Sequence, residues 1–381
     1  MDREELGAWL RLQLTPGVGN ATARRLLTAF GLPQGIFDAS AVSLEQVASS
    51  QQCAALQRLP EEWATLVDTT WQWLQGNETQ HRVLTLGDPG YPQSLLHMED
   101  PPMLLYGKGA AHMWNTGGLA NGMPQCLAVV GSRNPTAQGA ANARQFSKAL
   151  AQAGLTIVSG MALGVDGAAH EGALDGAGSG QLATIAVVGT GLDRVYPKQH
   201  LDLARRIAQH GVLLSEYPLG TPPLSANFPR RNRLIAGLSS GTLVVEAALQ
   251  SGSLITARLA IEQGKDVFAI PGSIHSTQSR GCHALIKQGA KLVESAKDVL
   301  DELQPASRPR QRTDLAAASD CPLGAEDALL EALGFEPTGL DALQARTGLD
   351  TATLQARLME FEIHGHVARL PGGLFQRIAQ S

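Results

Sequence analysis

The sequence lacks the features of a secreted or membrane-embedded protein. None of its apolar runs reaches the roughly 18–20 residues that are needed to span a bilayer. The first ten residues, MDREELGAWL, are acidic and do not follow the basic-then-apolar plan of a signal peptide. We therefore expect a cytoplasmic protein without a membrane partner.

Aromatic residues and cysteines are also scarce. Aromatic side chains make up 4% of the chain, and the four cysteines are far apart, without a CxxC or other metal-ligand spacing. These cysteines are Cys53, Cys126, Cys282 and Cys321. The sequence therefore predicts no metal site and no disulfide framework, but buried thiols in a reducing compartment.

Charged residues are sparse, at 17%, and they are unevenly distributed. The hydrophobic fraction of 44% indicates a globular chain, and 381 residues suggest two or three domains. Residues 1–125 carry 7 basic against 12 acidic side chains, and residues 306–381 carry 7 against 10. Residues 126–305 carry 16 against 13. A nucleic-acid partner would therefore be held by the middle segment.

The hydrophobic pattern divides the chain into parts. Residues 1–80 have helical spacing, whereas from Leu127 short apolar runs alternate with amphipathic stretches. This alternation predicts an α/β fold with a parallel sheet covered on both faces. The expected strands are 127–130, 155–159, 184–188, 212–215, 242–245, 267–270 and 291–293. The expected domains are a helical domain at 1–80, the sheet domain at 81–303, a linker at 304–321 and a small helical unit with a terminal hairpin at 322–381.

The turn after the first expected strand, GSRNPTAQG, is a candidate phosphate site. Gly131 permits close backbone approach, Ser132 offers a hydroxyl and Arg133 adds a planar cation, at the edge where open α/β sheets bind ligands. The alternative is a tight turn with a solvated arginine. The G-x-G-x-x-G fingerprint is absent here, and after Gly189 the third glycine is replaced by Arg194. We therefore expect no NAD or FAD cofactor.

The turn after the second expected strand contains a possible hydrolytic triad, Ser159, Asp166 and His170. No G-x-S-x-G elbow accompanies these residues. Gly160 and Gly164 flank the turn, and Asp166 should start a helix with His170 one turn later on the same face. We favour a structural hydrogen bond between the aspartate and the histidine over a triad.

The densest basic signal is the segment NFPRRNR. Pro229 fits the first position of a helix, which places Arg230, Arg231 and Arg233 in its first turn. Cations there oppose the helix dipole, which favours an anionic partner over a solvated basic face. Phe228 precedes the proline, so its backbone should be extended and its ring exposed.

Together with Lys198 in YPKQH, these cations and this ring predict a groove for single-stranded nucleic acid. In such a groove, cations contact the backbone and a ring stacks on a base.

An ordered set of motifs resembles the DprA/Smf family of DNA-processing proteins over residues 85–300. The motifs are GSRNPTAQG, SGMALGVDGAAHEGAL, GTGLDRVYPKQH, NFPRRNRLIAGLS, VVEAALQSGSLITARLAIEQGKDVFAIPG and LIKQGAKLV. The loose stretch 110–125 departs from the family pattern. The resemblance implies an extended Rossmann-like domain that binds single-stranded DNA without sequence preference, forms a homodimer and loads the recombinase RecA during natural transformation.

The resemblance implies no catalysis. By motif, the DNA site would comprise Gly131, Ser132, Arg133, Gly160, Lys198, Asn227, Phe228, Arg230, Arg231, Asn232 and Arg233.

The two ends of the chain resemble small DNA-binding modules. LTPGVGNATARRLL is similar to a helix-hairpin-helix or SAM-like element with Arg24 and Arg25, although its surroundings are acidic, so a packing module is an equal alternative. Residues 338–378 resemble a winged helix, with Thr338 as a cap, Gly348 as a helix stop and a wing turn at 371–373. Its expected recognition helix, 350–362, is acidic, which favours protein contact or domain packing over DNA reading.

Two other functions are possible. A lonely-guy-type nucleosidase has a related sheet, but Val244 and Val245 stand where its carboxylates are needed, and Glu246 comes one residue late. A ligand-responsive transcription regulator would need a winged helix that reads duplex DNA, and the acidic helix argues against it.

Overall fold

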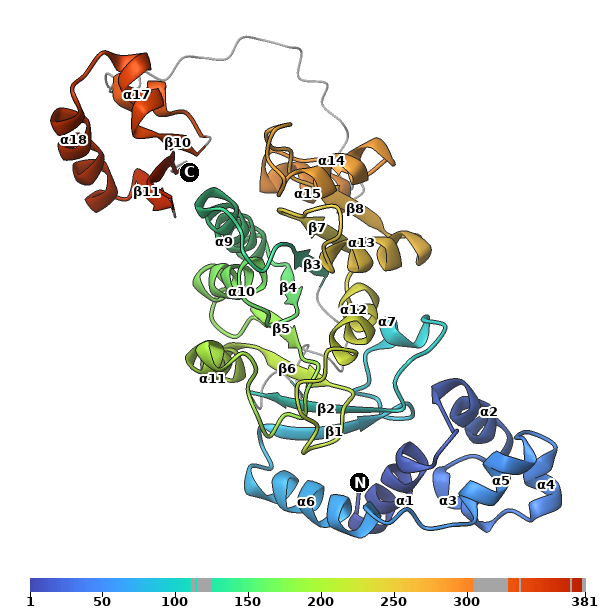
Figure 1. Ribbon diagram of the computed structural model, residues 1–381. Helices are drawn as coiled ribbons and strands as arrows, with labels where there is room; N and C mark the ends of the chain where they lie inside the picture. Colours follow the sequence, from blue (N-terminus) through green and yellow to red (C-terminus); the bar gives the residue numbers. More distant parts are fainter. Residues whose placement is uncertain (111–113, 115–124, 304–327, 336, 371, 379–381) are drawn as a thin grey trace.

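The computed structural model describes all residues except 111–113, 115–124, 304–327, 336, 371 and 379–381 (Figure 1). The stretch 110–125 and the expected linker therefore lie largely or wholly outside the described residues. Residues 1–76 form a helical domain, as predicted. Its helices are α1 (Arg3–Leu14), α2 (Asn20–Phe30), α3 (Pro33–Asp38), α4 (Ala41–Glu45), α5 (Ser50–Leu56) and α6 (Trp63–Gly76).

The central domain contains a nine-stranded sheet within the described residues, in the order β1-β2-β6-β5-β4-β3-β7-β8-β9. The strands are β1 (His81–Thr85), β2 (Leu104–Gly109), β3 (Cys126–Val130), β4 (Thr156–Ser159), β5 (Thr184–Val187), β6 (Val212–Ser215), β7 (Gly241–Val244), β8 (Asp266–Ala269) and β9 (Lys291–Leu292). Strands β3 to β9 pair in parallel. Every residue of β3 to β7 is buried, which explains their continuously apolar sequences. The predicted parallel sheet is confirmed.

Two strands of this sheet, β1 and β2, were not predicted. Strand β1 pairs with β2, and β2 pairs with β6, both in antiparallel fashion, so the two strands extend the sheet beyond its parallel part. Gly107 and Gly109 weaken the strand pattern of β2, because glycine has a low β-propensity. The strand forms because tertiary packing buries Leu104 and Tyr106.

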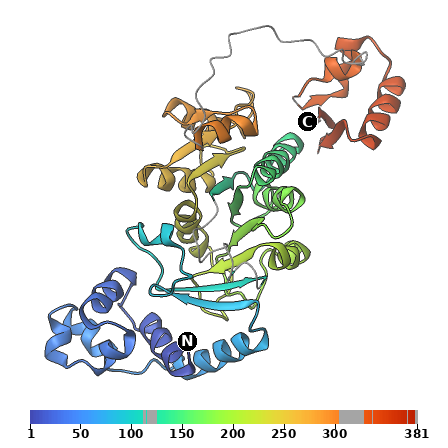
Figure 2. The same ribbon diagram turned by 180° about the vertical axis from the view of Figure 1, so that it is seen from behind.

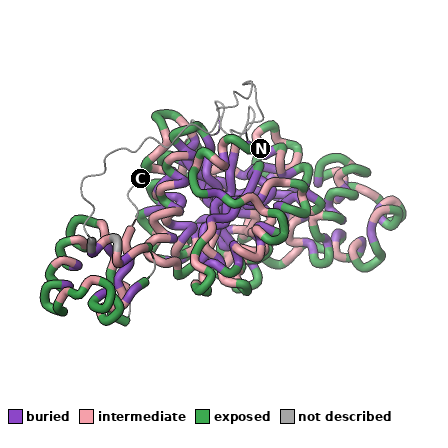
Figure 3. Tube along the Cα trace, turned by 90° about the horizontal axis from the view of Figure 1, so that it is seen from above, coloured by how far each residue is buried: buried purple, intermediate pink, exposed green. Residues whose placement is uncertain are grey.

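Helices cover both faces of the sheet (Figures 1 and 2). One face carries α9 (Ala137–Gln152), α10 (Val165–Gly176), α11 (Leu201–His210) and α15 (Ala296–Leu303), and the other carries α7 (Gln93–Leu96), α12 (Asn227–Leu238), α13 (Ser253–Glu262) and α14 (Arg280–Lys287). The short helix η1 (Lys198–His200) precedes α11. Burial is densest at the centre of this layered domain (Figure 3).

The strand order creates a topological switch at β3. The chain adds β4, β5 and β6 on one side of β3 and then returns to add β7, β8 and β9 on the other. In open α/β sheets, ligands bind outside the carboxyl ends of the strands at such a switch. The fold therefore directs attention to the turn after β3.

The C-terminal residues form a winged-helix arrangement. It consists of α16 (Ala328–Leu333), α17 (Leu340–Thr347), α18 (Thr351–Ile363) and a sheet of β10 (Thr338–Gly339), β12 (Leu374–Arg377) and β11 (Val367–Leu370). Gly348 ends α17 with a φ of 68°, as expected, but Thr338 is no cap. It lies in β10, and Gly339 occupies the N-cap position.

Cys53, Cys126 and Cys282 are buried and form no disulfide, whereas Cys321 lies outside the described residues. Among the residues described, no helix is both long and apolar enough to cross a bilayer. The same residues contain no cluster of His, Cys, Asp and Glu that could hold a metal ion.

Candidate functional site

A crevice opens at the topological switch, outside the carboxyl ends of β3 and β4. Its main chamber has a volume of about 500 Å³ and reaches the N-terminal ends of α12 and α13, and a recess of about 80 Å³ adjoins it. Both parts are lined by Arg133, Ala162, Phe228 and Arg231. Of the predicted site residues, the crevice is lined by Gly131, Ser132, Arg133, Gly160, Phe228, Arg231 and Asn232.

A close backbone approach builds the turn after β3. A Cβ atom on Gly131 would lie 2.9 Å from the carbonyl oxygen of Glu246, which accepts a hydrogen bond from the Ser132 backbone N–H at 2.7 Å. The buried Ser132 hydroxyl accepts from the Asn134 N–H at 3.1 Å and closes the turn. Arg133 lies between these anchors and is exposed. The turn therefore presents a cation at the mouth of the crevice.

Helix α12 places the three arginines of the NFPRRNR segment in different surroundings. The helix begins at Asn227, two residues before Pro229. Successive side chains on a helix point about 100° apart, so neighbouring arginines face different surroundings. Arg230 is exposed, Arg231 is 3% exposed, and the Arg233 side chain is 17% exposed. Of the three arginines that were predicted to meet an anion together, only Arg230 is therefore fully available to solvent.

Arg231 supports the floor of the crevice. Its Nη1 donates to the carbonyl oxygen of Val187 at the end of β5, and a Cβ atom on Gly160 would lie 2.2 Å from the same Nη1. Burial lowers the pKa of the Arg231 guanidinium to about 10, against the effect of Asp166. Burial likewise raises the pKa of the Asp166 carboxyl, and the Arg231 charge opposes that shift. Gly160 is thus required by the buried guanidinium.

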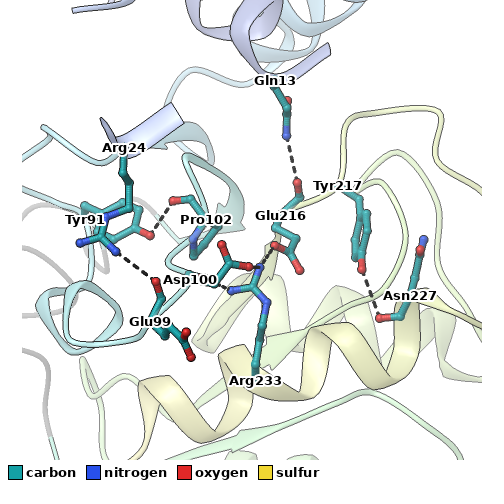
Figure 4. A network of polar contacts seen from close by, with 10 residues as sticks. All are labelled: Gln13, Arg24, Tyr91, Glu99, Asp100, Pro102, Glu216, Tyr217, Asn227 and Arg233. Atoms are coloured by element: carbon teal, nitrogen blue, oxygen red, sulfur yellow. Dashed lines mark hydrogen bonds and ion pairs between the residues drawn. The ribbon is translucent and has the colours of Figure 1, made fainter. Parts of the chain in front are cut away.

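Arg233 points into a polar network between domains (Figure 4). Its guanidinium pairs with the Glu216 carboxylate and lies 3.9 Å from that of Asp100. The Glu216 carbonyl oxygen accepts from Gln13 Nε2 of α1 at 3.1 Å. Burial raises the pKa of the Glu216 carboxyl, and Arg233 opposes the shift. Arg233 therefore ties α12 to Glu216, whose backbone in turn contacts the N-terminal helical domain.

Asn227 and Lys198 also lie outside the crevice lining. Asn227 is buried, its Nδ2 donates to the Gly189 carbonyl oxygen at 3.1 Å, and its own carbonyl oxygen accepts from the Tyr217 hydroxyl at 3.2 Å (Figure 4). It anchors the start of α12. Lys198 is exposed in η1, beyond the recess.

Phe228 lies inside α12, so the expected extended backbone is wrong. Pro229 is tolerated there because the first-turn N–H groups of a helix need no intrahelical acceptor. The half-buried Phe228 ring stacks on Tyr196, with ring centroids 5.6 Å apart and planes at 30°. The Arg133 guanidinium lies 5.8 Å from the Phe228 centroid. An exposed cation and two aromatic rings thus meet where the chamber and the recess join.

The expected Asp166–His170 hydrogen bond is also wrong. Asp166 Oδ2 accepts from the N–H groups of Gly160 and Ala162, at 3.1 and 3.2 Å. His170 Nδ1 lies 2.7 Å from the hydroxyl of Thr184, whose single proton is donated to a carbonyl oxygen of β4. His170 must therefore donate from Nδ1. Neither residue forms a triad.

Because His170 is buried, the free energy of unfolding should depend measurably on pH. Burial lowers the pKa of His170 to about 3, so only the unfolded chain takes up a proton near pH 6.5. Stability is therefore lost as the pH falls, by about 1 kcal/mol between pH 7 and 5.5. Urea unfolding at both pH values measures this decrease in the free energy of unfolding. In His170→Gln the decrease should be smaller by this amount. In His210→Gln, at an exposed position at the end of α11, it should equal that of the wild type. Equal pH dependence in the wild type and both variants would contradict the assignment.

Sequence reasoning missed several residues of the crevice. Tyr196 is one of them, and its signal in the sequence is an aromatic residue two positions before Lys198. The polar rim of the chamber near α13 has a weaker signal in the sequence, namely the serines that precede this helix. This rim consists of Asn134, Gln250, Ser251, Ser253 and Gln278.

Glu246 closes the neighbouring turn. Its carboxylate accepts from the Thr136 N–H at 2.9 Å and from the Thr136 hydroxyl at 2.5 Å, at the start of α9. Val244 and Val245 are buried. The carboxylate that the nucleosidase hypothesis required is thus engaged in a helix cap.

The N-terminal hairpin packs against the rest of the chain. Gly17 accepts from Gln52 Nε2 through its carbonyl oxygen at 2.7 Å, and Arg24 donates to the carbonyl oxygen of Glu99 at 3.1 Å (Figure 4). These contacts favour the packing interpretation of this module. Arg25 remains exposed.

Comparison with known proteins gives matches along most of the chain. A family model described as DNA recombination-mediator protein A matches residues 82–304, and one described as DprA winged helix domain matches residues 304–373. Protein Smf of Escherichia coli is 41% identical over 313 residues, which cover 81% of this chain and 80% of that protein.

Two solved structures are also similar. DNA processing protein A of Streptococcus pneumoniae has a TM-score of 0.64 and 36% identity, covering 80% of this chain and 99% of that one. DNA processing protein A of Helicobacter pylori, studied for its single-stranded DNA binding mode, has a TM-score of 0.50 and 32% identity, covering 58% and 95%.

Proposed function

The chain belongs to the DprA/Smf family of DNA recombination mediators, and from this premise we propose that it binds single-stranded DNA without sequence preference and loads RecA onto it. The observation that carries the proposal is the juxtaposition of Arg133 with the Phe228 and Tyr196 rings at the crevice mouth. A cation suits the phosphate backbone, and a ring accepts any base, because every base has a π-face. The single-stranded DNA binding of the Helicobacter pylori relative supports this assignment.

In this proposal, the residues of the predicted site have different roles. Arg133 and Arg230 are exposed and would contact phosphates, Phe228 would stack on a base, and Asn232 would line the chamber. Arg231 would hold the floor beneath them. Gly131, Ser132 and Gly160 would shape the backbone, whereas Asn227 and Arg233 would fix helix α12, and Lys198 would contact a longer strand outside the crevice.

Membership of the DprA/Smf family also indicates which partners to propose for this chain. We propose a cytoplasmic homodimer that works with RecA and has no catalytic activity of its own. The engaged Glu246 carboxylate speaks against the nucleosidase alternative, since a general acid or base must reach the substrate. The regulator alternative is weaker because α18 carries Glu360 and Glu362, which repel a DNA backbone.

Removal of the exposed Arg133 cation tests the proposal. Wild-type protein should bind oligo-dT in preference to a duplex of equal length, and Arg133→Ala should bind all single-stranded sequences more weakly. The slope of log K against log salt should shrink by about 0.7, the value for one lost phosphate contact. Arg144→Ala, at a cation on α9 that is paired with Asp175, is the matched control and should keep the slope. An Arg133→Ala variant with wild-type affinity and slope would reject the site.

A further inference from the structure

A second groove continues from the crevice on the α11 side of the sheet. It has a volume of about 410 Å³ and lies between α11, the start of β1 and the end of β2. Met161 and Tyr196 line both this groove and the recess of the crevice. The two cavities are therefore neighbours and meet at the turns after β4 and β5.

The groove combines an apolar floor with basic walls. Its floor includes the buried side chains of Val188, Leu192 and Leu213. The charged lining residues are Lys108, Arg194, Arg205 and Asp193, three cations against one anion. Cations in a groove suit the phosphates of a single strand, and Tyr196, which also lines this groove, offers a ring for a base.

Two of the three cations are available to an anion. Lys108 has no ion pair among the described residues. Arg205 pairs with Asp202 at 2.8 Å, but both side chains are highly exposed, at 67% and 88%, so this pair contributes little and is easily exchanged. Arg194 is held more firmly by Asp193 at 2.8 Å.

The junction between the cavities has two unusual features. Met161 has a φ of 63°, the only positive φ among the described non-glycine residues, and such strain in a bulky residue often marks a functional site. Its carbonyl oxygen lies 3.0 Å from His200 Nδ1, a contact that holds the strained turn against η1. Beside it, the Tyr196 ring is 49% exposed although it stacks on Phe228. An exposed ring between two cavities is placed to stack on a passing base.

We propose that a strand of single-stranded DNA leaves the crevice over Tyr196 and continues through this groove, where Lys108 and Arg205 contact its phosphates. This inference rests on the proposed function, since it extends the same binding site. It predicts that the protein contacts more nucleotides of a single strand than the crevice alone could hold.

Oligonucleotide length separates the groove from the crevice. We expect Lys108→Gln/Arg205→Gln to bind dT of about 16 nucleotides at least about fivefold more weakly than wild type, while it binds dT of about four nucleotides normally. The salt slope for the long oligonucleotide should fall by about 1.4, for two lost phosphate contacts. The control is Arg206→Gln, on the same helix but directed to Asp175 at 3.5 Å, which should bind both lengths like wild type.

The outcomes distinguish the two proposals. Unchanged long-oligonucleotide binding in the double variant would overturn the groove, while weakened binding of Arg133→Ala to both lengths would leave the crevice intact. A wild-type protein that binds neither length would overturn both. If the groove instead binds an acidic segment of a protein, the double variant should bind both oligonucleotide lengths like wild type.

Tyr196 tests base stacking at the junction between the crevice and the groove. Stacking needs the ring and not the hydroxyl, so Tyr196→Phe should bind the long oligonucleotide like wild type, and Tyr196→Ala should lose at least about fivefold. Equal losses in the two variants would overturn the stacking role.

Discussion

Replacing Arg231 by methionine is expected to lower the free energy of unfolding by about 1–3 kcal/mol, the cost of leaving a buried acceptor without its donor. The arginine is 3% exposed, and Asp166 is 8% exposed and depends on it to offset the cost of burial. The change would also leave the Val187 carbonyl oxygen without its guanidinium donor. Urea unfolding followed by circular dichroism measures the effect as a shift of the transition midpoint.

The neighbouring Arg230 is the matched control, because Arg230→Met removes the same charge from the same helix. Arg230 is exposed, so its replacement should change the free energy of unfolding by about 0.5 kcal/mol or less. It should instead weaken single-strand binding. An Arg231→Met protein as stable as Arg230→Met would show that Arg231 does not support the crevice.

This contrast shows what the sequence could predict at the site and what it could not. The parallel sheet was predictable because fully buried strands must be continuously apolar, and the turn after the first of them marks the ligand edge. The directions of the arginines were not predictable. The proline that seemed to mark the first position of α12 is its third residue. Successive residues of a helix are about 100° apart wherever it begins, so the packing of α12 on the sheet decides which arginine faces outward.

The pairing of the arginines depended on contacts distant in sequence. Arg233 pairs with Glu216 and lies near Asp100, while the Glu216 backbone accepts from Gln13 of the N-terminal domain, and no local pattern connects these residues. The same holds for β2, whose glycines obscure a strand that exists because its neighbours bury it. Local sequence therefore located the site, whereas tertiary contacts determined which of its residues face outward.

Phe228→Ala is expected to weaken oligo-dT binding by about 1–3 kcal/mol, the contribution of one base stacked on an aromatic ring. This corresponds to roughly 5- to 150-fold in affinity. The salt slope should stay nearly unchanged, because no cation is removed. Fluorescence anisotropy titrations at several salt concentrations give both quantities.

The ring also packs within the protein, so stacking and packing must be separated. Phe228 is half-buried against Tyr196, and a Cβ atom on Gly189 would lie 3.1 Å from it. Phe228→Leu keeps an apolar side chain in this position but has no π-face, so it should retain most of the stability and still lose affinity for oligo-dT. If Phe228→Leu instead binds like wild type while Phe228→Ala is both unstable and weak in binding, the ring serves only to position α12. In that case base stacking at the crevice mouth would have to depend on Tyr196 alone.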